Sequence, residues 1–418
     1  MFATEQTCGM LTTALCIPLG LCLHLPQVAD LYNFMKRRET ARVRREVKRL
    51  PPHQWYESGD IMRFIFLTNV RREDDVTTRA VRTALSPALE AFRLHGGDGS
   101  WSTEQQRVAA LIVFHCALFR AFGTKDFIAN FGFMLDLDAW DSRIFDAALC
   151  AARRCWQSQR AVFTEAYCPS RALRRLETAA RRGPRVSAEV FLERLVRRTC
   201  KQLRGLWDHR FQIALEAERT RSWRAVIESI MRVPHFGGTG FVAKELTSDL
   251  LQTCLFCTWS EASQTWESQC EDLNGWCPVG PGARRGLNRL HGRPTNAQAY
   301  SHSQAISDKF IQELLAIYAQ RTAHWNPSDL IEDLSPAGEL MLHDVQFQLC
   351  EFDKYERARL EQGRVRRYDI PEILRTPLTT LYLKAKGIAD GMGKIVEGNK
   401  ALAEQLRLGR GTPGLLLM

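Results

Sequence analysis

The feature that most constrains the fold is the spacing of apolar residues, which recur at helical intervals from about residue 31 onward. Such spacing places apolar side chains on one face of an α-helix, whereas alternating runs typical of strands are hard to find. The clearest example is residues 103–122, where Ser102 stands as a capping residue before a broad apolar stripe. We therefore expect an all-α protein with one compact multi-helix body.

Glycine and proline indicate where the predicted helices begin. We expect one helix from about Gly59 through Val70, another from about Ser187 after a Gly-Pro break, and a late helix that Ser335-Pro336 opens and that runs to Glu356. No internal repeat divides the chain. We expect three parts: an apolar N-terminal extension over 1–30, a helical body over 31–370, and a C-terminal helix and tail over 371–418.

Charge narrows the choice of partner. The 57 Lys and Arg residues exceed the 47 Asp and Glu residues and leave a net charge of +10, which favours polyanions, with nucleic acid first among them. No run of eighteen apolar residues occurs, so we expect no membrane-spanning helix. The apolar stretch over 10–25 has no Lys or Arg before it, unlike a secretory signal, and the 13 cysteines resemble reduced thiols. We expect an intracellular protein, nuclear in a eukaryote, rather than a secreted one.

A glycine-rich turn over 233–240 joins two predicted helices. Its glycines let the backbone approach a ligand closely, and free amides at the start of the second helix point at an anion. The pattern indicates either a helix-hairpin-helix that binds a DNA phosphate or an ordinary tight corner between helices. The candidate DNA-backbone residues are Gly237, Gly238, Gly240 and Lys244.

A second glycine cluster, over 280–289, also contains three arginines. A simple turn does not require clustered guanidiniums, which bind phosphate oxygens in pairs, so we favour an anion-binding nest. The candidate ligands of a phosphate or pyrophosphate are Gly280, Gly282, Arg284 and Arg285.

Two charged segments supply the remaining candidates. Residues 69–75 place acids next to arginines, which fits either a solvated ion-pair cluster or a site. In the late helix, positions 344, 351 and 355 share one face, so their side chains either line a cleft or are surface polar groups. The candidates are Asn69, Arg71, Arg72, Asp74 and Asp75 from the first segment, and Asp344, Glu351, Lys354 and Tyr355 from the second.

Two familiar motifs are incomplete. A Walker A loop requires four residues between its first glycine and the Gly-Lys pair, but five stand between Gly387 and Gly393, and Ile395 replaces the Ser or Thr that binds Mg²⁺. A Cys-x-x-Cys pair over 254–257 precedes two cysteines that six residues separate, which is poor spacing for zinc. We expect neither a P-loop in this chain nor a metal site.

In this order, the four segments resemble a known family, the helical domain associated with 5-hydroxymethyluridine DNA kinases. That family is grouped with the α-glutamyl/putrescinyl thymine pyrophosphorylases, which are tied to thymine hypermodification in phage DNA and occur also in some eukaryotes. The resemblance spans roughly Tyr32 to Tyr368. The matching stretches are FIFLTNVRREDD at 64–75, GGTGF at 237–241, GPGARRGLNRL at 280–290, HDV at 343–345 and CEFDKYER at 350–357.

The resemblance implies an architecture similar to that of helix-hairpin-helix DNA glycosylases, which extrude a base into a pocket. It implies DNA as a partner and a reaction in which an amine displaces pyrophosphate from an activated 5-hydroxymethyluracil, so the amine and the pyrophosphate on the base are co-substrates and no intrinsic cofactor is required. One departure is Val76, which stands where the family pattern has an arginine after the acidic pair.

The resemblance also implies roles for the candidates. Guanidiniums keep their charge at neutral pH and suit a departing pyrophosphate. Carboxylates suit the uracil imide or the proton of the attacking amine, and an amide suits the edge of the base. The implied pyrophosphate ligands are Arg284 and Arg285, with Arg71 and Arg72 second; the implied catalytic residues are Asp74, Asp75, Glu351 and Asn69.

Three functions remain open at this point. The protein is a DNA-base-modifying enzyme that acts on 5-hydroxymethyluracil or its pyrophosphorylated form, or it is a non-catalytic base-recognition module that works with a separate P-loop kinase. The third alternative is a helix-hairpin-helix glycosylase, for which Lys244 and Asp249 are the nearest catalytic candidates.

Overall fold

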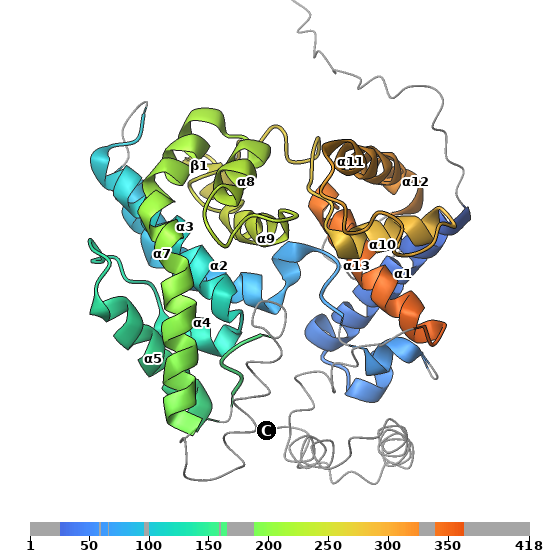
Figure 1. Cartoon of the computed structure of the whole chain (residues 1–418), viewed down its shortest axis with the longest axis horizontal. Helices are drawn as coiled ribbons and strands as arrows, with labels where there is room; N and C mark the ends of the chain where they lie inside the picture. Colours follow the sequence, from blue (N-terminus) through green and yellow to red (C-terminus); the bar gives the residue numbers. More distant parts are fainter. Residues whose placement is uncertain are drawn as a thin grey trace, which may run out of the picture.

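The computed structural model describes residues 26–57, 60–65, 67–95, 100–158, 160–164, 188–325 and 339–362, and nearly all of its regular structure is helical. Figure 1 shows two helical lobes side by side. The first contains α2 (Val76–Leu94), α3 (Thr103–Phe122), α4 (Lys125–Phe131), α5 (Ser142–Gln157), α7 (Ala188–Thr220), α8 (Trp223–Met231) and α9 (Phe241–Leu250). The second contains α1 (Pro26–Arg42), α10 (Pro281–Leu290), α11 (Gln304–Ala319), α12 (Arg321–His324) and α13 (Leu342–Arg359). The prediction of an all-α protein is confirmed.

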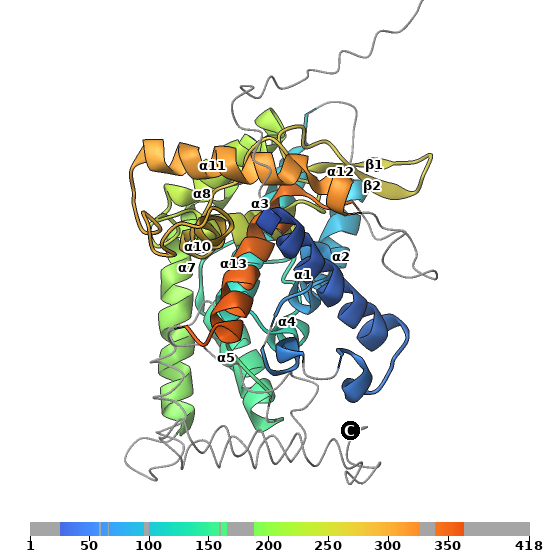
Figure 2. The same cartoon turned by 90° about the vertical axis from the view of Figure 1, so that its right-hand side faces the viewer.

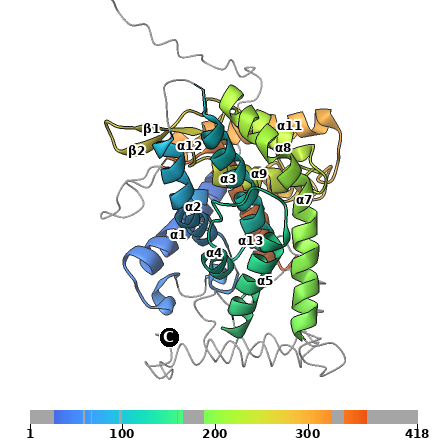
Figure 3. The same ribbon diagram turned by 90° about the vertical axis from the view of Figure 1, so that its left-hand side faces the viewer.

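The core of the first lobe forms around α3, which is apolar on nearly every side. The side chain of Ser102 accepts a hydrogen bond from the amide of Gln105, and Gln105 returns one to Ser102, so the helix begins where the sequence predicts. Gly123 ends it in the left-handed conformation that glycine adopts without strain. The long α7 runs alongside α3, as Figure 3 shows, and Phe114 meets Trp207 edge to face at 5.0 Å.

The second lobe is built around α13, which packs against α10, α11 and α1 (Figure 2). A Cβ atom on Gly286 of α10 would lie 2.3 Å from the carbonyl oxygen of Leu349, and one on Gly282 would lie 2.8 Å from the sulfur of Cys350. Glycine at these positions is therefore what lets the backbone of α10 approach α13 so closely. The same approach fixes how the arginines of α10 face α13.

The predicted helix from Gly59 through Val70 is wrong. Short 3₁₀ turns occupy Ile61–Phe64 and Arg72–Asp74, and Ile65 between them is extended. The side chain of Asp60 accepts a hydrogen bond from the amide of Met62, which starts the first turn. Met62 and Val70 of this segment are buried in the core of the second lobe, so tertiary burial rather than helix formation accounts for their spacing.

Other helix boundaries agree with the sequence in part. Helices α8 and α9 flank the glycine turn, while α7 extends from Ala188, where the described residues resume, so its predicted start near Ser187 lies outside them. Helix α13 begins at Leu342 and residues 339–341 before it are not helical, so the predicted start at Ser335-Pro336 is too early; the Gly183-Pro184 break lies outside the described residues. Most of the proposed N-terminal extension and all of 371–418 lie outside them as well.

The sequence did not predict the two-stranded antiparallel hairpin of β1 (Cys257–Ser260) and β2 (Thr265–Ser268). Trp259 pairs with Trp266 across it, and their rings meet at 5.7 Å. Each strand has four residues, too few to show a clear alternation of apolar and polar residues. Within the described residues, no helix is both long enough and apolar enough to cross a membrane.

Candidate functional site around α13

All four predicted segments contact α13 or one another. The loop over 69–75 binds α13 through its backbone: the side-chain amide of Gln348 donates to the carbonyl oxygens of Asn69 (3.1 Å) and Val70 (2.9 Å). The carboxylate of Asp344 accepts a hydrogen bond from the amide of Arg72 at 2.7 Å. Both α13 side chains are buried, so these bonds form where water does not compete and they fix the position of the loop.

The glycine turn is connected to α13 and the 69–75 loop through Lys244 and Glu245, in the first half of α9. The Lys244 ammonium donates to the side-chain carbonyl of Gln346 at 2.7 Å and lies 2.7 Å from the Glu245 carboxylate. The Arg72 guanidinium donates to the other oxygen of Glu245 at 2.8 Å. Both cations lie over the ring of Phe347, at 4.5 Å for Arg72 and 5.0 Å for Lys244. We refer to Arg72, Lys244, Glu245, Asp344 and Gln346 as the buried charge layer.

Burial and pairing set the protonation of this layer. Burial alone raises the pKa of the Glu245 carboxyl, but Arg72 and then Lys244 outweigh it, so the pKa falls well below its ordinary value. Beside the layer, burial lowers the pKa of His343, whose Nε2 lies 3.6 Å from the Asp344 carboxylate. At neutral pH, Glu245 is therefore ionised and His343 is neutral.

The glycine turn presents its outer part to solvent. Gly237 and Gly238 are exposed, and Gly238 and Gly240 have positive φ angles of 81° and 76°. Gly240 precedes α9 and gives it no side-chain cap. Within the described part of the chain, no acceptor takes a hydrogen bond from the amides of Gly237, Gly238 or Thr239. These amides are available to an anion at the start of α9.

Arg284, a predicted phosphate ligand, is buried and bound to the protein itself. Its guanidinium donates to the carbonyl oxygens of Val279 (2.7 Å) and Ser301 (2.7 Å) and to the hydroxyl of Ser307 (2.8 Å). Only 3% of the residue is exposed. In this geometry, Arg284 joins the start of α10 to the segment that leads into α11.

The next arginine, Arg285, has a different environment. Its Nε donates to one oxygen of Asp353 at 2.9 Å, and Nε of Arg289 donates to the other oxygen at 2.8 Å. Nε of Arg357, one turn further along α13, lies 3.3 Å from the same carboxylate. Asp353 is fully buried, whereas the arginine side chains are 20%, 11% and 29% exposed in that order. We refer to Arg285, Arg289 and Arg357 on Asp353 as the arginine cluster.

The acidic side chains and the side-chain amide of the 69–75 loop bond to nearby residues of the protein. Nδ2 of Asn69 donates to the carbonyl oxygen of Asp74 at 2.5 Å, and its Oδ1 accepts a hydrogen bond from Arg45 at 3.0 Å. Asp74 pairs with Arg71 at 2.9 Å, and Asp75 pairs with Arg72 at 3.0 Å. These bonds hold the loop in shape.

Glu351 differs from the other candidate acids. One of its oxygens accepts a hydrogen bond from Lys354 at 2.6 Å, while the other is buried and accepts none from a described residue. Nη2 of Arg38 on α1 is also buried without a partner among the described residues, although the Nη1 atom of Arg38 donates to Gln348. Tyr355, one turn beyond Glu351, accepts a hydrogen bond from Arg37 at 3.2 Å. Glu351 and Arg38, both buried, therefore form a face that retains an unused acceptor and an unused donor among the described residues.

Sequence reasoning missed the residues that complete these groups. Glu245 follows a candidate lysine but carries no motif of its own, and Asp353, Arg289 and Arg357 lay inside the quoted segments without an assigned role. The signal was helical spacing, since Arg285 and Arg289 are four residues apart, as are Asp353 and Arg357. Only the packing of α10 on α13 shows that the two pairs meet.

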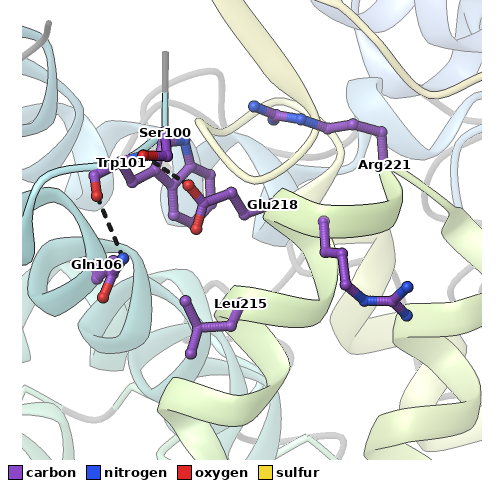
Figure 4. Close-up of a pocket in the computed structure, with 7 residues that line it drawn as sticks. Ser100, Trp101, Gln106, Leu215, Glu218 and Arg221 are labelled. Atoms are coloured by element: carbon purple, nitrogen blue, oxygen red, sulfur yellow. Dashed lines mark hydrogen bonds between the residues drawn. The ribbon is translucent and has the colours of Figure 1, made fainter.

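A surface pocket lies away from these groups. It has a volume of about 550 Å³ between the start of α3 and the end of α7, and Trp101, Leu215 and Glu218 are among its lining residues (Figure 4). None of the predicted site residues lines it. Among the residues that the structure describes, no group of three or more His, Cys, Asp or Glu side chains could hold a metal ion.

The fold and these contacts define a helical two-lobed protein in which remote segments meet at α13. The family described as "5-hmdU DNA kinase, helical domain" matches residues 102–364, well over half of the 418 residues, and the chain belongs to this family. Membership gives the protein a role in the modification of hydroxymethyluracil in DNA. The match includes the glycine turn, the arginine cluster and α13, while the 69–75 loop precedes it. No curated protein and no solved structure matches the chain.

Proposed function

We propose that the protein binds DNA at 5-hydroxymethyluracil, turns the base out of the helix, and acts on its hydroxymethyl group or on the pyrophosphorylated form of that group. The observation that carries the proposal is the family match together with the meeting of the four segments at α13. Enzymes that do chemistry on a base commonly turn it out of the stack, so that a protein pocket can surround the reacting group.

The glycine turn supports contact with the DNA backbone. Its amides just before α9, which no described residue uses, form a small site of positive potential, and phosphate oxygens readily accept hydrogen bonds from such amides. Lys244 does not add to this site from the surface, because its side chain is fully buried and paired. Its role in the proposal is to fix α9 against α13, which holds the turn in place.

The face formed by Glu351 and Arg38 supports base recognition. Uracil presents an N3–H donor between two carbonyl acceptors, and a carboxylate beside a guanidinium offers the complementary groups. Glu351 therefore is the carboxylate that we assign to the base or to the proton of an attacking amine, with the amine and a nucleotide-derived pyrophosphate as co-substrates. Asp74, Asp75 and Asn69 shape the adjoining loop.

A binding comparison tests this proposal. Two duplexes that differ only in thymine or 5-hydroxymethyluracil at one position would be titrated over a salt series, and we expect tighter binding to the modified duplex at every salt concentration. Equal affinity for both duplexes would contradict base recognition. Incubation of the modified duplex with a nucleoside triphosphate and an amine, followed by nucleoside analysis, tests for reaction by the protein itself.

A backbone variant tests the role of the turn. Gly238→Ala adds a methyl group with nothing within 4 Å but strains a positive φ angle, and Gly132→Ala at the end of α4 does the same with φ of 71°. We expect Gly238→Ala to lose about 1–2 kcal/mol of stability, and Gly132→Ala, whose ψ of −159° belongs to a region almost restricted to glycine, to lose about 1–3 kcal/mol. Only Gly238→Ala should also weaken DNA binding, equally for both duplexes. Unchanged DNA binding in Gly238→Ala would remove the turn from the interface.

One observation favours a second function, a base-recognition module without catalysis. The acids of the 69–75 loop and the buried charge layer are bound to protein cations, so few groups remain for proton transfer. A separate kinase would then supply the chemistry. Selective binding with no product in the complete reaction mixture, and product only when a partner kinase is added, would identify this function.

The glycosylase alternative has no support from geometry. Lys244 is paired with Glu245, and Asp249 accepts two hydrogen bonds from Arg120 at 2.5 Å in the core. Both charges are therefore already paired inside the protein. Abasic sites in 5-hydroxymethyluracil DNA after incubation with the protein would nevertheless establish that activity.

A further inference from the structure

The arginine cluster has donors left over after all of its internal bonds are made. Each arginine faces Asp353 through Nε, which leaves the Nη groups for other partners. One Nη of Arg285 donates to the hydroxyl of Tyr300 at 3.0 Å, and one Nη of Arg289 donates to Gln362 at 3.1 Å. Among the described residues, none accepts a hydrogen bond from Nη2 of Arg285 or Arg289, or from either Nη of Arg357.

The cluster also has a surplus of positive charge. Three guanidiniums around one carboxylate give a net charge of +2. The cluster lies toward the C-terminal ends of α10 and α13, each of which contributes roughly half a negative charge, so about one positive charge remains. Because Asp353 is fully buried, it holds the guanidiniums together without occupying their solvent-facing side.

We infer that the arginine cluster binds a phosphoryl group, and specifically the phosphate or pyrophosphate carried by a nucleotide or by the modified base. This inference rests on the proposed function and names the ligand of one part of that site. Guanidiniums suit it because each presents two parallel N–H groups to two phosphate oxygens and stays charged at neutral pH. The phosphoryl ligands are therefore Arg285, Arg289 and Arg357. Arg284 is not among them, because its guanidinium is bonded to other groups of the protein.

The position of the cluster agrees with such a ligand. A Cβ atom on Gly280 would lie 3.7 Å from the side-chain oxygen of Thr239, so α10 begins against the glycine turn. Arg285 is five residues further along, about 8 Å at the rise of an α-helix. Tyr300, 62% exposed and bonded to Arg285, adds an aromatic side chain next to the cluster, on which a base can stack.

Calorimetric titration of the full chain with inorganic pyrophosphate at constant ionic strength tests the inference. We expect saturable binding to one site, weakened at least tenfold in Arg357→Gln and in Arg289→Gln. Arg359→Gln is the matched control, because Arg359 is exposed on the same helix and pairs with Glu356 instead of Asp353. It should bind pyrophosphate within twofold of the unchanged protein.

Two results would overturn the inference: no saturable binding of pyrophosphate, or equal binding by the unchanged protein, Arg357→Gln and Arg289→Gln. Far-ultraviolet circular dichroism would verify that each variant is folded, and Arg357→Gln keeps two arginines on Asp353 if Arg289→Gln does not fold. Competition identifies the source of the phosphoryl group. If a nucleoside triphosphate displaces pyrophosphate and unmodified duplex does not, the phosphoryl group comes from a nucleotide or from the modified base. If unmodified duplex displaces pyrophosphate, the cluster binds the DNA backbone instead, and that source is overturned.

The failure of this inference is distinguishable from the failure of the proposed function. Base-selective DNA binding without pyrophosphate binding would leave the proposed function intact and remove the cluster as its phosphoryl site. Pyrophosphate binding that depends on Arg357, in a protein that binds both duplexes equally, would retain the cluster and contradict base recognition.

Discussion

The buried charge layer and the arginine cluster are built from the same parts but differ in what they leave for a ligand. In the layer, Arg72 and Lys244 both contact Glu245, and all three side chains are buried between the lobes. In the cluster, the acid is buried but its three arginines reach solvent. The comparison teaches that an arginine-rich motif becomes a binding site only where its outer N–H groups remain unused; otherwise it joins parts of the fold.

The largest effect should come from Glu245→Gln in the layer. This change leaves Arg72 and Lys244 buried without their shared counter-charge, so we expect a loss of about 3–5 kcal/mol in the free energy of unfolding. Chemical denaturation would measure it. Glu356→Gln is the control, because Glu356 pairs with the exposed Arg359, and it should cost less than about 1 kcal/mol. Equal losses in the two variants would abolish the distinction between the layer and a surface pair.

Gly286→Ala should affect the cluster through its backbone support. The added Cβ atom would lie 2.3 Å from the Leu349 carbonyl oxygen, so α10 must move away from α13, at a cost of about 1–3 kcal/mol. Gly275→Ala is the control, since its Cβ atom meets only an ordinary contact at 3.5 Å. We expect thermal unfolding to show the difference, and pyrophosphate titration to show weaker binding in Gly286→Ala. Full retention of both properties would mean that the close helix contact does not position the arginines.

A fall in pH just below neutrality should lower the free energy of unfolding, by less than either of the two substitutions above. The folded state lowers the pKa values of both His343 and Glu245, so it binds fewer protons than the unfolded chain and is less stable as pH falls. The contribution of His343 is complete above its ordinary pKa of about 6.5 and declines below it, and that of Glu245 declines below about 4.5. Chemical denaturation between pH 7.5 and 5.5 should show a free energy of unfolding that decreases with falling pH, and His343→Gln should make this decrease smaller. The same decrease in the variant would exclude His343 as its source.

The smallest effect on stability should come from Arg357→Gln in the cluster. Its Nε contact with Asp353 is the longest of the three at 3.3 Å, and two arginines remain on the carboxylate, so we expect a loss of less than about 1 kcal/mol. The midpoint of chemical denaturation would measure it. A loss as large as that of Glu245→Gln would show that the cluster is structural, like the layer.

Much of the fold was readable from the sequence. The span of α3, its cap at Ser102 and the glycine turn between α8 and α9 follow from local rules of helix periodicity and capping. The same rules wrongly predicted a helix from Gly59, because Met62 and Val70 are buried by other elements rather than along one helix. The β1–β2 hairpin was too short to show a pattern.

The candidate site was predicted as segments but not as contacts. Sequence reasoning placed Arg284 and Arg285 together as phosphate ligands, yet adjacent residues on a helix point in different directions. One donates to backbone carbonyls inside the protein and the other reaches the surface of α10. Lys244 was expected at the surface as a phosphate contact, and its burial depends on Gln346 and Phe347, about a hundred residues away.

The sequence by itself determined the helical class, the positions of several helices such as α3, α8 and α9, and the four segments that resemble the family, because these depend on local spacing and residue type. Only the tertiary structure decided which charges are buried and which are available. Burial depends on contacts between residues remote in the chain, and it changes the cost of a charge and the partners it requires far more than residue type does. That is why Arg72 joins the two lobes while Arg357, equally charged, faces solvent.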